Sequence, residues 1–347
     1  MKKYKLYTHS EKAFDAMLYA VKNAEQSIYW ESYIFNNDLL LTHDFFSVFK
    51  NKAKAGVKVV FILDGLGSYG IAKEAIEDLK KAGVEVYFFT SWWRRTHRKL
   101  LIVDDRVAFL GGVNVGHAYR KWLDLHLRTT ESALLPVMIH SFAKSYAMCG
   151  GRDQSVLAER NTRKTVRETK LKFFEHWPIF GKLRLRELYE ERVEHAKKSI
   201  VIVSPYFIPH TWLRKALLAA VNRGVKVSII IPEHTDPAIG DISNYYIADL
   251  LTPCGIHFFL QTQMNHAKAL LVDDEEAMIG SHNIDALSFD FNQEAGVFFN
   301  KKDMVRDLKK IISKWQEDST PFEKIVWHRR WYYPLVSLIV RLAQPVS

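Results

Sequence analysis

The chain carries the same set of reactive side chains twice. A histidine is followed by a lysine two residues later and by an aspartate seven residues later, and the two copies have identical internal spacing. The first copy is His97, Lys99 and Asp104, and the second is His266, Lys268 and Asp273. A repeated pattern of this kind indicates one active site assembled from two similar halves.

Each copy is followed by a turn of small residues that ends in an asparagine, Gly111–Asn114 in the first case and Gly280–Asn283 in the second. Together the copies supply two imidazoles, two ammonium groups and two amides, with Ser281 as a further hydroxyl. Ammonium and amide donors match the charge of a phosphoryl transition state. We therefore predict that Asn114, Ser281 and Asn283 bind a substrate phosphate.

The two histidines can divide the chemistry between them. One imidazole can attack phosphorus and form a covalent intermediate. The other can protonate the leaving oxygen and then take a proton from the incoming nucleophile. A pKa near 6.5 allows histidine to serve in either protonation state, and the sequence leaves open which of His97 and His266 is the nucleophile.

Apolar runs after each His-x-Lys predict a buried strand, Leu100–Val103 and Ala269–Val272. Residues i and i+2 of a strand point the same way, so the histidine and lysine of each copy share a face. An acidic turn and a second strand follow, which predicts a hairpin. Asp104 and Asp273 of the catalytic motif fall at that turn. We therefore expect them to have a structural role, in hydrogen bonds to the backbone or to a neighbouring basic side chain.

One acidic residue lies beyond each asparagine, at nearly matched positions: Asp124 in the first half and Glu294 in the second. A nucleophilic imidazole needs its other nitrogen held by a partner, as in a catalytic triad. We predict that Asp124 orients His97 and that Glu294 orients His266. The alternative is that both acids lie on the surface.

The repeat extends over most of the chain. Ser27-Ile28 matches Ser199-Ile200, and Gly56-Val57 matches Gly224-Val225, each glycine ending an amphipathic helix before a strand. Alternating helices and strands predict the α/β class, with two similar α/β/α sandwich halves about a pseudo-two-fold axis and the active site at their interface. The predicted units are an N-terminal half (1–150), a basic connector (151–183), a C-terminal half (184–320) and an apolar tail (321–347).

These motifs resemble the phospholipase D superfamily, and within it the bacterial cardiolipin synthases. Similar segments include Trp122–Asp124, Ser204–Pro209 and Gly280–Asp285, so the likeness covers almost the whole chain. The resemblance implies a phosphohistidine intermediate, no metal, no cofactor, and transfer of a phosphatidyl group to a second lipid alcohol. The chain departs from the family at Ala286, where an arginine is usual, at Glu131-Ser132, and in lacking the paired N-terminal transmembrane helices of many such enzymes.

Composition fits a globular body with a basic surface. The 347 residues suffice for two domains, 48% are hydrophobic, and the net charge of +10 suits either anionic lipid headgroups or nucleic acid. Cys149 and Cys254 show no metal spacing and are typical of free thiols in a reducing compartment. No signal peptide is evident, and no apolar run reaches the 18 or so residues of a spanning helix.

Three segments suggest contact with a membrane surface. The first is the connector, which is rich in arginine and lysine. The second is Ser91–Thr96, which places tryptophans and arginines just before the first motif. The third is the tail, where aromatic and basic residues precede an apolar run after Pro334. For each segment the alternative is ordinary packing or a solvated loop. We expect a peripheral protein on the cytoplasmic side of the cell membrane, with an anionic phospholipid membrane as its partner.

The function that we predict is a phosphatidyltransferase that makes cardiolipin from phosphatidylglycerol or another phospholipid donor. One alternative is a phospholipase D-type phosphodiesterase, in which water replaces the second alcohol, and a less favoured one is a nuclease. A third is a catalytically silent membrane-binding protein, which the intact His, Lys and Asn residues of both copies argue against. The acceptor alcohol, the balance of transfer and hydrolysis, and the oligomeric state are left open.

Overall fold

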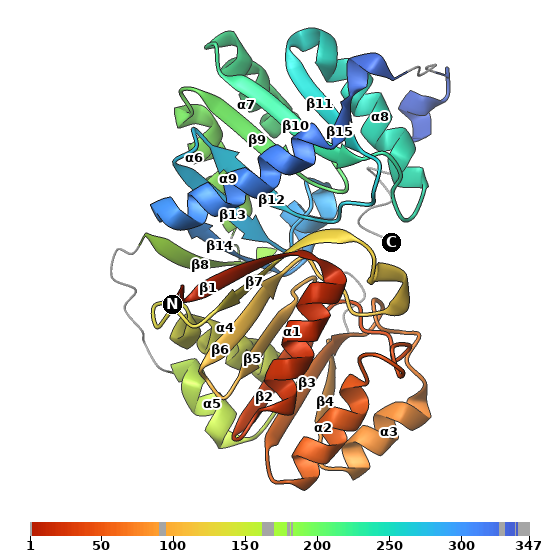
Figure 1. Ribbon diagram of the computed structural model, residues 1–347, viewed down its shortest axis with the longest axis vertical. Helices are drawn as coiled ribbons and strands as arrows, with labels where there is room; N and C mark the ends of the chain where they lie inside the picture. The colour runs from red at the N-terminus through yellow and green to blue at the C-terminus, as the bar shows by residue number, and fades with distance from the viewer. Residues whose placement is uncertain are drawn as a thin grey trace.

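The computed structural model describes residues 2–89, 95–161, 170–178, 181, 183–325, 330–336 and 338. Two β-sheets with flanking helices are stacked along the long axis of the molecule, one in each half of the chain (Figure 1). The predicted tail and Ser91–Arg94, and the middle of the predicted connector, fall largely outside the described residues.

The first half is built around a sheet with the strand order β1-β7-β6-β5-β2-β3-β4. Strands β2, β3 and β4 are parallel to one another, and the remaining neighbours are antiparallel. The strands are β1 (Tyr4–His9), β2 (Ser27–Ser32), β3 (Lys58–Asp64), β4 (Glu85–Phe89), β5 (Leu100–Val103), β6 (Val107–Gly111) and β7 (Leu123–Thr129). The helices are α1 (Ser10–Lys22), α2 (Phe45–Lys54), α3 (Lys73–Lys81), α4 (Leu135–Met148) and α5 (Gln154–Asn161), with a short 3-10 helix at His117–Tyr119.

The second half repeats this arrangement in the order β8-β14-β13-β12-β9-β10-β11, and β15 is added beside β11. The strands are β8 (Leu171–His176), β9 (Ser199–Val203), β10 (Lys226–Pro232), β11 (Ile256–Gln261), β12 (Ala269–Val272), β13 (Glu276–Gly280), β14 (Glu294–Phe299) and β15 (Ser319–Pro321). The helices are α6 (Arg184–His195), α7 (Thr211–Asn222), α8 (Ile239–Leu251) and α9 (Lys302–Glu317), with short helical turns at Thr252–Cys254, Leu287–Phe291 and Phe322–Lys324. The predicted class, two similar α/β halves, is confirmed.

Strand β8 occupies in the second sheet the place that β1 occupies in the first. It pairs antiparallel with β14, and Phe174 and the nearby Trp177 are buried. The predicted connector therefore contains a core strand, so the second half begins at β8 rather than at residue 184. Sequence reasoning missed this strand because basic residues surround it and only Phe173-Phe174 break the polar run.

Helices cover both faces of each sheet, because the central strands are apolar on both sides. In β3, Val60 and Ile62 face a central core cluster, while Phe61 and Leu63 face a cluster formed with α1, α2 and α3. A third cluster lies under α6, α7 and α8. The central core cluster joins α4, α9 and strands of both sheets, so the two halves share one core.

The motif hairpins turn at paired aspartates with positive φ, Asp104-Asp105 and Asp273-Asp274. Two successive positive φ values are what the two central residues of a type I′ turn require, and Asp tolerates them better than most residues. The Asp104 carboxylate accepts hydrogen bonds from the backbone N–H groups of Gln26 (2.7 Å) and Ser27 (2.9 Å). It thereby ties the hairpin to the start of β2.

Asp273 does the same in the second half, accepting from the N–H groups of Lys198 (2.7 Å) and Ser199 (2.9 Å) at the start of β9. The pKa values of Asp104 and Asp273 are lowered: partial burial raises each, but the backbone donors outweigh it. Both aspartates stand at the far end of the strand from the histidine of their motif, so they have the structural role expected from the sequence.

Replacement of Asp104 by Asn is expected to lower the free energy of unfolding by about 2 kcal/mol. The charged carboxylate accepts hydrogen bonds from several backbone N–H groups, whereas a neutral amide accepts them more weakly and with one oxygen only. Urea unfolding of the purified protein measures the change. Asp274→Asn is the matched control at the next position of the equivalent turn, where the carboxylate is half exposed and bonds only Lys309 among the described residues; its effect is expected to stay below about 0.5 kcal/mol. Equal losses for the two variants would contradict the role given to Asp104.

Candidate active site

The two motif histidines lie where the halves meet, just before β5 and β12. The backbone N–H of His97 donates to the carbonyl of Gln293 (2.9 Å), and the N–H of Gln293 donates to the carbonyl of Arg95 (2.8 Å). In the equivalent place the N–H of His266 donates to the carbonyl of Leu123 (2.7 Å). Each histidine is thus held by backbone of the opposite half, one residue before that half's acidic residue.

This pairing crosses the carboxylates between the halves. The Nδ1 atom of His97 lies 2.9 Å from Oε1 of Glu294, and Nδ1 of His266 lies 2.9 Å from Oδ2 of Asp124. The predicted partners, Asp124 for His97 and Glu294 for His266, are therefore wrong, although both acids do contact an imidazole. The repeat reveals one acid per half, but only the packing of the halves decides which imidazole it reaches.

Burial favours the neutral form of each imidazole in the crossed pairs, and neither Nε2 has a hydrogen-bond partner among the described residues. Burial lowers the pKa of His97 to about 4, although the charge of Glu294 opposes the shift. Burial and Lys268 lower the pKa of His266 to about 3 against the influence of Asp124. For Glu294, burial raises the pKa, but His97 and its other donors outweigh it and hold it low. A neutral imidazole whose Nδ1–H is bonded to a carboxylate presents an Nε2 lone pair, the form that a nucleophile or general base needs.

Each motif lysine lies on the same face of its strand as its histidine. The ammonium of Lys99 donates to the carbonyl of His97 (2.7 Å), and that of Lys268 donates to the carbonyl of His266 (2.5 Å). Burial lowers the pKa of Lys99 to about 7 and that of Lys268 well below its usual range. A bound phosphate anion would restore the charge of both, so the pocket gains electrostatic attraction when it is filled.

The two asparagines are buried at the end of the second motif strands. Within the described chain, the side-chain oxygens of Asn114 and Asn283 have no hydrogen-bond partner. These unpaired oxygens are acceptors and are available to a donor group of a ligand. The phosphate contact predicted for the two residues would instead use their amide N–H groups and stays a prediction.

Ser281 contacts a different group from the one predicted. Its hydroxyl donates to Oε2 of Glu294, and Ser288, in the turn Leu287–Phe291, donates to Oε1 (2.8 Å). Ser281 and Ser288 therefore hold the carboxylate that orients His97, whereas a phosphate contact was expected of Ser281. In the first half Gly112 takes the place of Ser281, because a side chain there would collide with the Asp124 carboxylate.

Other residues at the site were missed by sequence reasoning. The ring of Tyr33 lies edge-on to His97, with centroids 4.6 Å apart, and the ring of Trp122 lies 5.4 Å from that of His266. Asp285 is buried nearby, and burial raises its pKa to about 6. Their only signal in the sequence was position: Tyr33 follows a central strand, Trp122 precedes Asp124, and Asp285 follows Asn283.

Among the described residues, no group of three or more His, Cys, Asp or Glu side chains is arranged to hold a metal ion. Lys99 and Lys268 place two buried amine groups beside the two imidazoles.

The duplicated sandwich with a shared site of this kind defines a phospholipase D-like protein. A phosphatidylserine synthase from Haemophilus influenzae Rd KW20 has the same fold, with a TM-score of 0.79 over 99% of this chain and 94% of that one at 12% identity. A polyphosphate kinase from Porphyromonas gingivalis also matches 99% of this chain and 53% of its own, with a TM-score of 0.62 at 12% identity.

Sequence comparison narrows the class to one family. The family model described as "Cardiolipin synthase, PLD-like domain" matches residues 17–142 and 189–315, and the chain belongs to this family. Cardiolipin synthase 1 of Bacillus anthracis is 31% identical over 93% of this chain and 68% of its own length. Probable cardiolipin synthase YwiE of Bacillus subtilis is 29% identical over 94% of this chain and 68% of its own.

The crossed pairs can be tested one at a time. Glu294→Gln is expected to abolish the hydrogen-bonded Nδ1–H signal of His97 in ¹⁵N-edited NMR spectra and to leave that of His266 in place; Asp124→Asn should do the reverse. Each variant is expected to lower kcat by up to about 10⁴-fold, as loss of a triad carboxylate does. If Asp124→Asn instead removed the His97 signal, the crossed arrangement would be wrong.

Proposed function

We propose that the protein is a phosphatidyltransferase that makes cardiolipin from phosphatidylglycerol by way of a covalent phosphohistidine. The observation that supports this most strongly is the pair of carboxylate-held imidazoles beside two buried lysines. Membership of the cardiolipin synthase family supports the choice of lipid. Phosphatidylglycerol is both the donor of the phosphatidyl group and the source of the attacking alcohol.

In the first step, Nε2 of one histidine attacks the lipid phosphorus. The bond between phosphorus and the glycerol oxygen breaks, the electron pair stays on that oxygen, and the other histidine gives it a proton. The carboxylate on Nδ1 of the attacking ring stabilises the positive charge that the ring acquires. Lys99, Lys268 and the two asparagine amides bind the phosphate oxygens, and the phosphate in turn raises the pKa of the imidazole that must carry a proton.

In the second step, the glycerol hydroxyl of another phosphatidylglycerol attacks phosphorus. The P–N bond breaks, its electron pair returns to the imidazole, and the other histidine accepts the hydroxyl proton, so both rings regain their starting state. The products are cardiolipin and glycerol. Every proton and charge in the two steps is carried by groups of this chain or by the lipids, for either assignment of His97 and His266.

We infer that the protein binds the membrane peripherally, at the loops around the first half of the site. Leu40, Leu41 and Leu66 are exposed, Leu41 completely, and Tyr69, on the same loop as Leu66, is also exposed. None of the helices in the described part of the chain is long and apolar enough to cross a bilayer. Loops with exposed leucines next to a lipid-handling site are suited to the bilayer interface, and the net charge of +10 suits anionic headgroups.

We further propose that this membrane surface is cytoplasmic. Cys149 and Cys254 are both free, and the Cys254 side chain is exposed. An exposed free thiol is typical of a reducing compartment.

Purified protein mixed with phosphatidylglycerol vesicles is expected to yield cardiolipin and glycerol in equal amounts, measured by mass spectrometry. His97→Ala and His266→Ala should each lower the rate by at least about 10³-fold, since both rings are needed in both steps. His195→Ala, on the exposed end of α6, is the matched control. Phosphatidic acid as the sole product would identify a hydrolase, and cleavage of DNA in preference to lipid would identify a nuclease.

The membrane surface has its own test. Leu40→Glu combined with Leu41→Glu is expected to weaken binding to phosphatidylglycerol vesicles by at least about tenfold in co-sedimentation, because each leucine contributes about 1.5–3 kcal/mol when fully buried. Turnover of short-chain lipid below its micelle concentration should be unchanged. Met148→Glu, at the end of α4, is the control with an exposed apolar residue elsewhere. Unaltered vesicle binding by the double variant would refute the assignment.

A further inference from the structure

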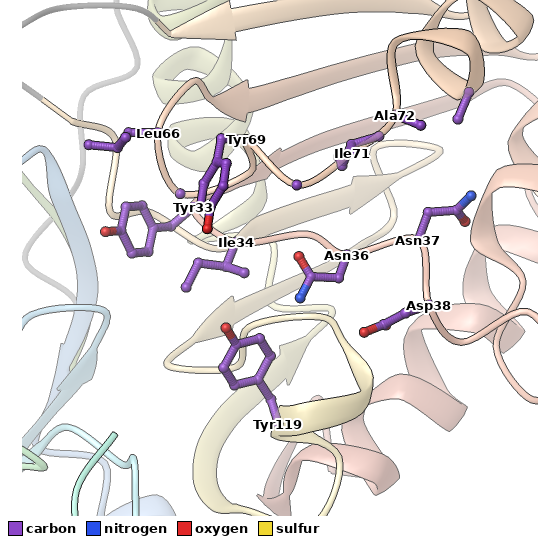
Figure 2. A pocket seen from close by; sticks show the side chains of 13 residues that line it. Tyr33, Ile34, Asn36, Asn37, Asp38, Leu66, Tyr69, Ile71, Ala72 and Tyr119 are labelled. Atoms are coloured by element: carbon purple, nitrogen blue, oxygen red, sulfur yellow. The ribbon is translucent and has the colours of Figure 1, made fainter. Parts of the chain in front are cut away.

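A cavity of about 620 Å³ lies beside the candidate active site in the first half. It is bounded by the loop after β2, the loop between β3 and α3, and the 3-10 helix His117–Tyr119 (Figure 2). Its size is within the range of pockets that take a small molecule or headgroup. Neither of the two chemical steps described above assigns a role to the residues that line it.

The cavity is lined by neutral hydrogen-bonding groups. Asn36, Asn37, Tyr69 and Tyr119 line it, and their side chains make no hydrogen bond within the described part of the chain. Figure 2 shows the rings of Tyr69 and Tyr119 on opposite sides of the space, with their hydroxyls directed into it. Phenol and amide groups both donate and accept, which suits the hydroxyls of an alcohol.

The charge of the walls argues against a second phosphate site. No Lys, Arg or His is among the described residues that line the cavity, and Asp38 is its one charged lining residue in that part of the chain. The Asp38 carboxylate accepts from the N–H of His117 (2.9 Å). An anionic group would be repelled here, whereas a neutral polyol would find donors and acceptors.

Two aromatic contacts join the cavity to the two histidines. Tyr33, one of its walls, touches His97, and the ammonium of Lys99 lies 4.9 Å from the centre of the Tyr33 ring. On the other side, Tyr119 lies edge-on to Trp122 at 4.9 Å, and Trp122 contacts His266. A group in the cavity is therefore separated from His97 by the ring of Tyr33 and from His266 by the rings of Tyr119 and Trp122.

Among the described residues, the second half is packed differently at the corresponding place. At the corresponding place, the hydroxyl of Tyr206 donates to the carbonyl of Asp236, across the loop between β10 and α8. A side chain at Gly240 would collide with Tyr206 and Thr235. The second half is packed closely at this place, whereas the first half has an open cavity. The shared site is therefore asymmetric, although its histidines and lysines are duplicated.

We propose that this cavity binds the alcohol of the reaction, the glycerol end of the phosphatidylglycerol headgroup, and so selects the acceptor. The proposal rests on the phosphatidyltransferase function proposed above and adds its specificity. The alcohol that leaves in the first step and the one that attacks in the second occupy the same side of phosphorus, opposite the nucleophile. One alcohol pocket therefore serves both steps.

In the second step the cavity holds the glycerol of the acceptor lipid by its inner hydroxyl. The terminal hydroxyl then forms the O–P bond as the P–N bond breaks, and its proton passes to the histidine that is not bound to phosphorus. Water or a small alcohol needs no such pocket. Occupation of the cavity thus favours transfer to a glycerol headgroup over transfer to water or methanol.

A partition experiment measures this selection directly. Phosphatidylglycerol vesicles are turned over in the presence of added methanol, and cardiolipin, phosphatidylmethanol and phosphatidic acid are quantified by mass spectrometry. Because the three products arise from the same phosphoenzyme, their ratio depends on the second step alone. Changes in the rate of the first step do not affect it.

Gly70→Leu fills the cavity without disturbing the fold, because a Cβ at Gly70 meets no atom within 4 Å and its φ is not positive. It is expected to lower the ratio of cardiolipin to phosphatidylmethanol at least tenfold. Tyr119→Phe, which removes one hydroxyl, should lower the ratio about fivefold, the effect of one neutral hydrogen bond. The controls are Ala219→Leu, on the exposed side of α7, and Tyr19→Phe, on α1; both should keep the wild-type ratio.

The outcomes separate this proposal from the function on which it rests. If the wild-type protein makes no cardiolipin, the proposed phosphatidyltransferase function fails and the alcohol pocket falls with it. If the wild type makes cardiolipin but Gly70→Leu and Tyr119→Phe both keep its product ratio within twofold, the function stands and the pocket assignment is overturned.

Discussion

The site depends on one interaction made twice across the interface between halves: a buried carboxylate holding Nδ1 of the other half's imidazole. Burying a carboxylate is unfavourable unless donors surround it. Glu294 meets this condition with His97, Ser281 and Ser288, and Asp124 meets it with His266 and a backbone N–H. The carboxylates therefore fix the approach of the halves and the orientation of the rings at once.

The rest of the fold supports that contact. Backbone hydrogen bonds on either side of the interface bring His97 beside Glu294, and the central core cluster between α4 and α9 joins the sheets behind the site. At the other end of each motif strand, Asp104 and Asp273 bind the backbone at the start of β2 and β9. Each eight-residue motif thus connects both ends of its strand to a neighbouring element. The histidine lies at one end, and the aspartate that binds the backbone lies at the other.

Much of this was predictable because a duplicated motif carries spatial information. The His-x-Lys spacing gave the shared face of each strand, and the matched glycines gave the repeated order of helices and strands. The crossed pairs were not predictable, since a repeat shows what each half contains and not how the halves dock. Strand β8 and the hydroxyl of Ser281 were misjudged for a related reason: their partners, β14 and Glu294, become neighbours only in the folded protein.

The crossed carboxylates also link activity to the completion of synthesis. When the ribosome has made the first half, His97 is present but the acid that orients it lies 197 residues further along the chain. Asp124 is equally without its imidazole at that stage. A partly made chain therefore has no histidine that its carboxylate holds, so the reactive groups come together only when the whole repeat has been synthesised.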